Sequence, residues 1–579
     1  MFRRALYRGF SLLAEGKIRK FKADTLSPSQ AQLTKLLSIV KANAASSFGQ
    51  EHNFSSIETV ADFQAATPVR DYEGFRPYID RATNGESQVL TEAAPLMYAT
   101  TSGTTGLPKY IPITPGYMEE FRLASVVSGY HLLKSFPQID RGVTLSVASP
   151  AVEGRTPGGT PYGAISGQLF QQEPYLIKKY ISPIPYEVYL ISDYETRYYT
   201  LLRLALVLPL SLFYTLNPST ISLLCRRLKR FAPALIEDIR RGTISPPQAL
   251  DATTMAALKN HLSKDPKRAL ILEALLNNGE FVPHKIWPTL SLVSCWTKAS
   301  AAFYLSDFPE HFGPLPICDI TYGASEGRGT VFMGPGLQVL ALQSHFFEFI
   351  PEDQIEASSP TVLLADQLAV GQNYFILFTT SGGLYRYNIN DVVKVTGFYN
   401  ATPLLEFQYK GGNISSFTGE KITELQVTAA VQRAAKQLGL RLRFFTVIPT
   451  FRPEPHYQVW VEPDGALAGA LDGDPVTAAL DAQGQSILKS LGLAIDSALS
   501  VENGEYKVKR QSLRLAPIDV RVLASGSYER FRKYLTGKGV ADAQIKVSHL
   551  NPKDEVAKYF EAELLDNVPG HLSKSLSSI

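Results

Sequence analysis

The segment formed by residues 100–109 has the composition of a loop that binds phosphate. Its residues are Thr-Thr-Ser-Gly-Thr-Thr-Gly-Leu-Pro-Lys, which supply five hydroxyls, two glycines and one lysine. Glycines let backbone N–H groups approach a ligand closely, and the hydroxyls and the lysine add donors and positive charge. The pattern is not a Walker A loop, because Pro108 and Tyr110 flank the lysine. We predict a polyphosphate site here, and a polar surface loop is the alternative that composition alone leaves open.

A second candidate is the segment 322–327, Tyr-Gly-Ala-Ser-Glu-Gly, which follows a strand-like apolar run. Glu326 fits the ligand of a cation that lies beside phosphates. The same letters also match the G-x-S-x-G pattern of α/β-hydrolases, in which Ser325 would be a nucleophile. Such a nucleophile needs a histidine as its base, and the candidates are His345 and His456. The pattern is short, so both hypotheses stand at this point.

A third candidate is Asp391, within the segment Leu-Tyr-Arg-Tyr-Asn-Ile-Asn-Asp-Val-Val at 384–393. We predict that this aspartate lies in a turn between two strands, where its carboxylate can accept hydrogen bonds from a ribose diol. Most turn aspartates only stabilise the turn. The hypothesis that Asp391 binds a ligand therefore depends on the two segments described above.

The elements that must position these segments alternate between helical and strand-like patterns. A helix is predicted at 27–47, capped by Ser27 with Pro28 after it, and another begins at about Pro115. Helical patterns dominate 219–280, with breaks at Gly242 and at Pro246 and Pro247. The segment 153–163 is rich in glycine and proline and is predicted to be a loop. Strand-like runs occupy 96–100, 290–294, 317–321, 339–342, 374–379 and 392–396. This interleaving indicates an α/β fold.

The composition changes near 411–420, where Gly, Ser, Asn and Thr cluster without apolar periodicity. We predict a hinge there. Beyond it we predict a small α+β domain. Its helices are expected at 422–438, 478–498 and 527–535, and its strands at 443–448, 458–462 and 519–523. The chain is thus predicted to divide into residues 1–417 and a mobile part at 418–579, with the hinge at about 411–421.

Composition excludes several classes of protein. The chain has 579 residues, of which 45% are hydrophobic, so it can form a packed core. Its net charge is only +3, which gives no argument for nucleic-acid binding. Three cysteines without Cys-x-x-Cys spacing indicate neither a disulfide framework nor structural zinc, but buried reduced thiols in a cytoplasmic protein. The apolar run at 201–216 is shorter than the roughly 20 residues that span a bilayer, so we predict a core element.

The N-terminus is basic, with seven lysines and arginines among its first 22 residues. It lacks the unbroken apolar stretch of a signal peptide. Phe2, Leu6, Phe10 and Leu13 recur at helical spacing and predict an amphipathic helix. A surface helix is the simpler interpretation, and a helix that lies on a membrane surface is the alternative.

Taken together, the three segments resemble the T-S-G-T-T-G-x-P-K, Y-G-x-T/S-E and Y-R-x-G-D motifs of the ATP-dependent adenylate-forming superfamily. Residues 30–92 and 384–410 resemble more closely the acyl acid amido synthetases, the auxin-responsive family that conjugates plant hormones to amino acids. The resemblance covers about 30–550. It implies an α/β fold with a large N-terminal adenylate-forming domain, in which helices flank β-sheets, and a smaller mobile α+β C-terminal domain. It also implies ATP and Mg²⁺ as cofactors.

The resemblance implies a role for each matching residue. Residues that would contact ATP or AMP are Thr101, Ser102, Gly103, Thr104, Thr105, Gly106, Lys109, Tyr322, Gly323, Ala324, Ser325, Asp391, Phe407 and Lys410. Glu326 would bind Mg²⁺, and the catalytic lysines would be Lys421 and Lys546. We expect the acyl pocket between 117–135, 153–168 and 322–344, lined by Tyr162, Phe332 and Met333. The chain departs from the family pattern in three places: Asn390 replaces glycine, Lys410 replaces arginine, and Ser548-His549 replaces Pro-Arg.

The function implied is an acid–amino acid ligase that forms an acyl-AMP and transfers the acyl group to an amine. Its expected partners are a small carboxylic acid and an amino acid or other amine, without nucleic acid or stable membrane insertion, and the expected state is a monomer in the cytoplasm. Three alternatives remain. They are an acyl-CoA or carrier-protein ligase, a serine hydrolase that uses Ser325, and a nucleotide-binding module without catalysis.

Overall fold

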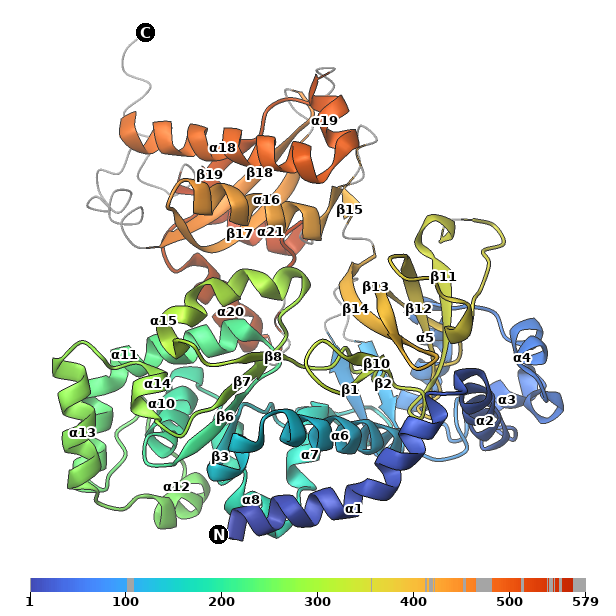
Figure 1. Cartoon of the computed structure of the whole chain (residues 1–579), viewed down its shortest axis with the longest axis horizontal. Helices are drawn as coiled ribbons and strands as arrows, with labels where there is room; N and C mark the ends of the chain where they lie inside the picture. The colour runs from blue at the N-terminus through green and yellow to red at the C-terminus, as the bar shows by residue number, and fades with distance from the viewer. Residues whose placement is uncertain are drawn as a thin grey trace. The chain divides into compact units, whose positions relative to one another are not determined.

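The structure is a computed structural model. It describes residues 2–101, 109–355, 357–411, 414–415, 420, 422–450, 454–464, 482–511, 515–538, 540, 545, 547–550 and 554–565. The chain divides into two compact units, Met1–Phe407 and Gln408–Ile579 (Figure 1). The predicted division after residue 417, with a hinge at about 411–421, concerns motion between the parts and stays a prediction.

A parallel sheet of unit 1 confirms the predicted alternation of strands and helices. Its strand order is β3-β6-β7-β8, and every neighbouring pair is parallel. The strands are β3 (Val143–Ser146), β6 (Leu210–Tyr214), β7 (Leu292–Cys295) and β8 (Ile317–Asp319). The helices of this region are α7 (Ile165–Gln171), α8 (Tyr175–Tyr180), α9 (Glu187–Leu190), α10 (Tyr194–Ala205), α11 (Pro218–Arg241), α12 (Ala252–Leu258), α13 (Pro266–Asn277), α14 (Pro283–Ile286) and α15 (Phe308–Phe312). Parallel strands need such crossovers, and their burial on both faces explains why β6 and β7 are apolar runs without alternation.

The apolar run at 201–216 is a core element, as predicted. It comprises the end of α10 and all of β6, where Leu201, Leu202 and Phe213 are buried. Arg203 is also fully buried, and its guanidinium donates to the carbonyl oxygens of Thr243 and Asp238. Among the described residues, no helix is long and apolar enough to cross a membrane.

Two further sheets of unit 1 are built mainly from antiparallel pairs. The first has the order β11-β12-β13-β14-β10-β9, and the second has the order β2-β1-β5-β4. The strands of the first sheet are β9 (Thr330–Phe332), β10 (Gln338–Leu340), β11 (Phe346–Pro351), β12 (Asn373–Thr379), β13 (Tyr387–Tyr399) and β14 (Thr402–Lys410). Those of the second are β1 (Met97–Thr101), β2 (Lys109–Ile113), β4 (Gly154–Arg155) and β5 (Pro161–Gly163).

The prediction that 153–163 is only a loop was wrong. The segment contains β4 and β5, which pair with each other, and β5 also pairs in parallel with β1 through Tyr98 and Tyr162. Strands of two and three residues have no apolar alternation to reveal them. They form because β1 offers an open row of backbone donors and acceptors, which a neighbouring segment must satisfy.

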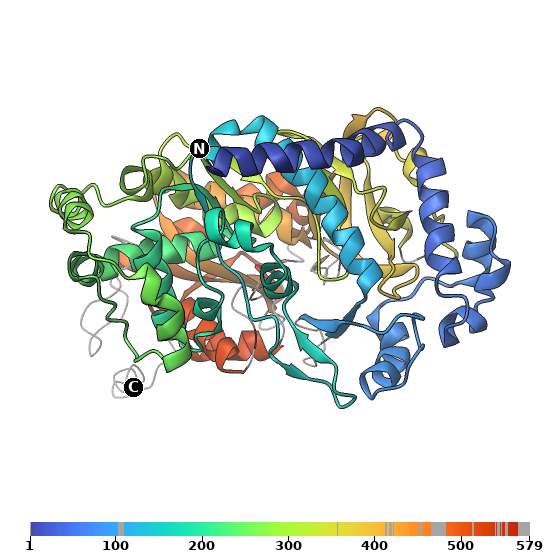
Figure 2. The ribbon, with the colours of Figure 1, turned by 90° about the horizontal axis from the view of Figure 1, so that it is seen from below.

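The N-terminal helices pack on the antiparallel sheet and on α6 (Pro115–Ser135). Helix α1 (Phe2–Asp24) packs against α6 and crosses it at an angle, as Figure 2 shows. Its buried face is formed by Ala14, Ile18 and Phe21, whereas Leu13 is 85% exposed. The predicted apolar face was therefore wrong at Leu13, which lies beside the buried row of Ala14, Ile18 and Phe21 rather than in it. The remaining helices here are α2 (Pro28–Lys41), α3 (Ser47–Glu51), α4 (Val60–Ala66) and α5 (Tyr72–Thr83).

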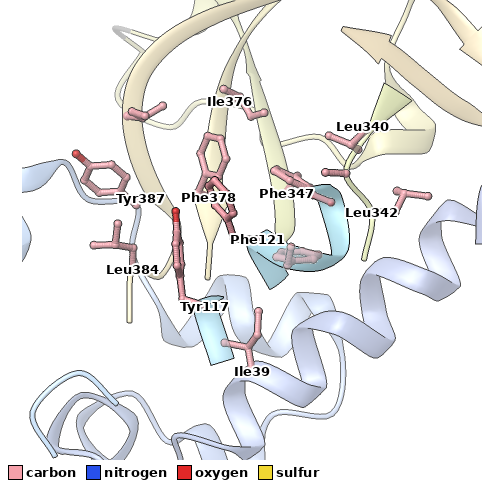
Figure 3. Packing of buried hydrophobic residues seen from close by; sticks show 14 of the residues in the cluster. Ile39, Tyr117, Phe121, Leu340, Leu342, Phe347, Ile376, Phe378, Leu384 and Tyr387 are labelled. Carbon is pink, nitrogen blue, oxygen red and sulfur yellow. The ribbon is translucent and has the colours of Figure 1, made fainter. Parts of the chain in front are cut away.

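Helix α2 confirms the helix predicted after Ser27, although it ends at Lys41 rather than at 47. Pro28 occupies its first turn, but the Ser27 side chain makes no capping hydrogen bond. The main core of unit 1 lies between α6 and the antiparallel sheet. Figure 3 shows Tyr117 and Phe121 of α6 pointing toward Phe347 and Phe378 of that sheet.

Unit 2 confirms the predicted small α+β domain. Its sheet has the order β17-β18-β19, with helices α16 and α18 packed on each other and on the sheet. The strands are β17 (Arg441–Thr450), β18 (His456–Asp464) and β19 (Asp519–Val522), beside the short pair β15 (Ile414–Ser415) and β16 (Ile422–Thr423). The helices are α16 (Glu424–Gln437), α18 (Ala482–Glu502), α19 (Gly504–Gln511), α20 (Ser527–Gly537) and α21 (Asp554–Ala562).

The three cysteines are free and buried, as predicted. Burial raises the pKa of Cys225 and Cys318 to about 12 and raises the pKa of Cys295 further still. Buried thiols of this kind are inert.

The end of α11 provides a test of the fold. Gly242 has φ +74°, and a Cβ there would lie 2.8 Å from the backbone nitrogen of Lys264. We expect Gly242→Ala to lower the free energy of unfolding by about 1–2 kcal/mol, because only glycine takes this conformation freely. Gly16, inside exposed α1, has open space at its Cβ position. Gly16→Ala is the matched control, and urea unfolding should show no loss of stability. Equal losses in both variants would contradict the argument.

Candidate active site

The predicted phosphate segment is held at both ends by paired strands. Thr101 ends β1, Lys109 begins β2, and these two residues are register partners. The ammonium of Lys109 lies 5.0 Å from the ring centroid of Tyr72 on α5. Ser102–Gly106, which carry most of the predicted phosphate contacts, lie outside the described residues. Their role stays a prediction.

The second segment forms a tight turn between β8 and β9. Gly323 and Arg328 pair as an antiparallel bridge, and the N–H of Ala324 donates to the carbonyl of Gly327 over 2.8 Å. Gly327 is required for packing, because a Cβ at this position would lie 2.6 Å from the ring of Phe378. The turn thus has a defined backbone and little room for larger residues.

The turn does not have the context of a nucleophile elbow. In α/β-hydrolases, the G-x-S-x-G pattern joins a strand to a helix. Here the segment joins β8 to another strand, β9. His345, one of the two candidate bases, accepts a hydrogen bond at Nε2 from the backbone N–H of Arg328 over 3.0 Å. The structure therefore gives no support to Ser325 as a nucleophile.

Asp391 lies inside one strand rather than between two strands, so that prediction was wrong. Strand β13 continues through it, with a register shift opposite Phe375 and Leu377. Asn390 has φ +64°, in the left-handed region, and its N–H donates to Oδ1 of Asn388 over 2.8 Å. A bulge of this kind re-aims the next side chain without ending the strand.

The same bulge explains how the chain tolerates its departure from the family glycine. Asparagine is among the non-glycine residues that most readily adopt left-handed conformations. Asn390 can therefore keep the geometry that a glycine would provide, and Asp391 keeps its direction.

The structure brings the second and third segments together. The Tyr322 hydroxyl donates to Oδ2 of Asp391 over 2.8 Å. The ring of Tyr322 stacks on Phe407 with centroids 5.6 Å apart and an interplanar angle of 11°. Burial, together with the carboxylates of Asp391 and Glu326, raises the pKa of Tyr322, so this phenol stays a donor. Residues separated by up to 85 positions thus form one aromatic and acidic surface.

Glu326 is the candidate metal ligand, and its side chain is only 6% exposed. Among the described residues, no group of three or more His, Cys, Asp or Glu could hold a metal. A magnesium ion held largely by nucleotide phosphates and water needs only one or two protein carboxylates. The donor set therefore fits Mg²⁺ that arrives with a nucleotide, and it does not fit a metal site built by protein alone.

The three predicted acyl-pocket residues lie in different surroundings. Tyr162 of β5 is half-buried, and its ring lies edge-on to Tyr110 at 5.4 Å. Phe332 and Met333 are 4% and 6% exposed and belong to core clusters. The backbone N–H of Phe332 donates to Oγ of Ser128 on α6, which ties β9 to that helix. Their contact with an acid stays a prediction.

The two catalytic lysines predicted near unit 2, Lys421 and Lys546, lie outside the described residues, and Lys410 is the half-buried last residue of β14. The segment after Lys546 is nevertheless firmly anchored within unit 2. The N–H of His549 donates to Oε1 of Glu424 over 2.6 Å, and its ring stacks on Phe445 at 4.2 Å. Burial lowers the pKa of His549, so the ring is neutral near pH 7. Ser548 and His549, which replace Pro-Arg, therefore pack against α16 and β17.

Two residues that the motifs do not include support the turn, Tyr117 directly and Glu120 beside His345. The hydroxyl of Tyr117 donates to the carbonyl of Ser325 over 2.7 Å. Glu120, one helical turn later, is buried and lies beside His345. The sequence indicates only that both residues lie near the start of the helix predicted from about Pro115. Nothing in their spacing indicates these contacts.

The bulge at Asn390 gives a second test. We expect Asn390→Val to lower the free energy of unfolding by about 1–3 kcal/mol, because a β-branched residue is strained at positive φ. Asn390→Gly, the control, should change it by less than about 1 kcal/mol. Thermal and urea unfolding measure both. A valine variant as stable as the glycine variant would refute the left-handed bulge.

Comparison with known proteins matches three successive segments of the chain to the domains of one family. The GH3 family N-terminal, central and C-terminal domains match residues 17–317, 338–410 and 425–555. Jasmonoyl--L-amino acid synthetase JAR4 of Nicotiana attenuata is 24% identical, with 92% of each chain covered. Indole-3-acetic acid-amido synthetase GH3.8 of Oryza sativa subsp. indica is 25% identical, with 97% of this chain and 94% of the relative covered.

A solved structure, AtGH3.15 acyl acid amido synthetase in complex with 2,4-DB, has the same fold. Its TM-score is 0.80 at 22% identity, with 94% of this chain and 96% of that chain covered. The resemblance predicted from the motifs is confirmed, because three family domains match in order along one chain. The protein therefore belongs to the GH3 family, which includes acyl acid amido synthetases.

Proposed function

We propose that the protein is an ATP-dependent ligase that adenylates a carboxylic acid and transfers the acyl group to an amine, most simply an amino acid. The observation that carries this proposal is the cluster of Tyr322, Asp391 and Phe407, with the buried carboxylate of Glu326 four residues from the tyrosine. The cluster offers an aromatic face and acceptors for the hydroxyls of a nucleoside. The turn at 322–328, which carries Glu326, would then meet the metal ion and the phosphates of the same nucleotide.

The chemistry explains why such a surface is needed. A carboxylate is a poor acyl donor, since its leaving group would be oxide. Its oxygen attacks the α-phosphate of ATP, pyrophosphate leaves, and the acyl-AMP that forms has AMP as a good leaving group. A neutral amine then attacks the acyl carbon and releases AMP. Bound Mg²⁺ would neutralise phosphate charge during the first step.

Each part of the site has a task in this scheme. Asp391 would accept hydrogen bonds from the ribose hydroxyls, and the stacked rings of Tyr322 and Phe407 would hold the nucleoside. The segment 100–109 would surround the phosphates with N–H groups and hydroxyls, which stabilise developing charge without reorganising. Glu326 would hold the magnesium that accompanies ATP.

The two half-reactions have different partners, which suits a mobile small domain. Lys546 would enter the site for adenylation and leave it for amide formation. Support comes from the anchored segment that follows it, because Ser548 and His549 are fixed to β17 and α16. An anchored segment would carry the lysine as unit 2 moves.

The acyl-CoA ligase remains the second candidate, because it shares the first half-reaction. The match to the GH3 central domain at 338–410 favours the amide ligase. We further propose a monomer in the cytoplasm, where the three buried thiols would stay reduced.

The enzyme class is tested by ATP–pyrophosphate exchange across a panel of carboxylic acids, followed by an amino-acid panel with the best acid. We expect acid-dependent exchange and an amide product. Asp391→Asn should raise the KM for ATP about tenfold, because ribose hydrogen bonds to a charged acceptor are worth about 1.5–3 kcal/mol. Exchange followed only by thioester formation with CoA would favour the second candidate.

The mobile-domain scheme is tested by separating the two steps. Lys546→Ala should lower acid-dependent exchange by about 10²-fold or more, because it removes a cation that offsets developing phosphate charge. Amide formation from preformed acyl-AMP should stay within about twofold of the wild type. Single-turnover assays measure the second rate. Equal loss in both steps would contradict the scheme.

A further inference from the structure

Two side chains from outside the turn at 322–328 hold its backbone on either side of Glu326. The hydroxyl of Tyr117 donates to the carbonyl of Ser325 over 2.7 Å. Nε2 of His345 accepts from the N–H of Arg328 over 3.0 Å. Only Glu326 and Gly327 lie between these two anchor points. The position of the Glu326 backbone therefore depends on both.

The hydrogen bond from Arg328 fixes the tautomer of His345. A backbone N–H can only donate, so Nε2 must carry the lone pair, and the proton of the neutral ring must sit on Nδ1. Nδ1 lies 3.1 Å from Oε2 of Glu120, a close approach that lacks the geometry of a hydrogen bond. The ring is fully buried, between Tyr117 on one side and the edges of Phe347 and Phe378. It has no room to change its orientation.

Glu120 is held in turn by a third residue. Its Oε1 lies 2.5 Å from the ammonium of Lys35 on α2, and the hydroxyl of Ser381 donates to the same oxygen. Glu120 is 4% exposed. Burial alone would raise its pKa, but His345 and Lys35 lower it below the ordinary value, so it stays a carboxylate. The group beside Nδ1 is thus a carboxylate near neutral pH.

We propose that Lys35, Glu120 and His345 form a buried relay that, together with Tyr117, positions the turn so that Glu326 meets the metal–nucleotide. The four residues act on the reaction through the turn, and they are positioning residues rather than catalytic ones. The role of Glu326 rests on the function proposed above. The relay itself rests only on the contacts just described.

The relay makes the turn sensitive to acid. The charged groups that face His345 are Glu120 from α6, Lys35 from α2 and Arg328 from the turn. Burial, helped by Lys35 and Arg328, lowers the pKa of His345 against the opposing effect of Glu120. A group with a depressed pKa binds fewer protons in the folded state, so its contribution is complete above the ordinary histidine pKa of about 6.5 and is lost as pH falls below it. Protonated Nε2 would face the N–H of Arg328 donor to donor.

The first experiment measures the turn directly, by hydrogen exchange of peptides that cover 322–330. His345→Leu keeps the bulk of the side chain but removes the acceptor, and Tyr117→Phe removes the other anchor. Both should accelerate exchange in these peptides about tenfold, the factor expected for one lost buried hydrogen bond. His345→Gln, whose amide oxygen can reach the Nε2 position, should stay near the wild type. His311→Gln, at a buried histidine on α15, is the matched control and should leave these peptides unchanged.

The second experiment measures the consequence for the reaction. In ATP–pyrophosphate exchange, His345→Leu should raise the Mg²⁺ concentration for half-maximal rate about tenfold, with less than about a twofold change in the KM for the acid. The wild type should lose activity only as pH falls well below 6.5, through the lowered pKa of His345 in the folded protein, and His345→Gln should lack that loss, because glutamine does not titrate.

The outcomes decide the proposal in either direction. Unchanged hydrogen exchange in His345→Leu and Tyr117→Phe would overturn it. Glutamine and leucine variants that are equally impaired and equally unstable would also overturn it, because His345 would then only fill space. If His345→Leu does not fold, hydrogen exchange in Tyr117→Phe decides alone. A wild type without exchange for any acid would refute the proposed function, while the hydrogen-exchange result would still decide the relay.

Discussion

The hydrogen bond from the Tyr322 hydroxyl to Asp391 joins two sheets that the chain builds separately. Tyr322 follows the parallel sheet, which is made by helical crossovers, and Asp391 lies in the bulge of β13, in the antiparallel sheet. Neither sheet alone brings these side chains together. A buried carboxylate needs a donor, and a buried phenol needs an acceptor, so each pays for the desolvation of the other. The ring of Tyr322 also stacks on Phe407, so two contacts hold the turn that carries Glu326 against the antiparallel sheet.

Much of the fold follows from local pattern. The parallel strands are short apolar runs that need no alternation, and α11 ends at Gly242 because only glycine fits there without strain. Prediction failed where structure comes from pairing instead. Strands β4 and β5 exist because β1 has backbone groups to satisfy, and the buried face of α1 is chosen by α6. Neither partner can be known from the segment itself, since both contacts span long separations in sequence.

In the candidate site, too, local pattern predicts some residues and misses those that depend on distant contacts. Glycines and hydroxyls at close spacing mark 100–109 and 322–327 as candidates, because that composition is typical of loops that bind phosphate. No such restriction marks Tyr117 or Glu120, whose contacts with Ser325 and His345 span more than 200 residues. His345 was noticed as a candidate base, and the structure gives its Nε2 a backbone N–H instead. Asn390 replaces the glycine of the family motif but keeps the positive φ that the bulge requires.

The burial of all three cysteines has a practical consequence for the study of motion in this chain. A maleimide dye reacts with exposed thiolates, and thiols that are buried and hard to deprotonate are poor targets. A single cysteine placed on the surface of each unit could therefore be labelled without removing the native ones. Fluorescence energy transfer between two such dyes would report the distance between the units through a catalytic cycle, in the otherwise unaltered protein.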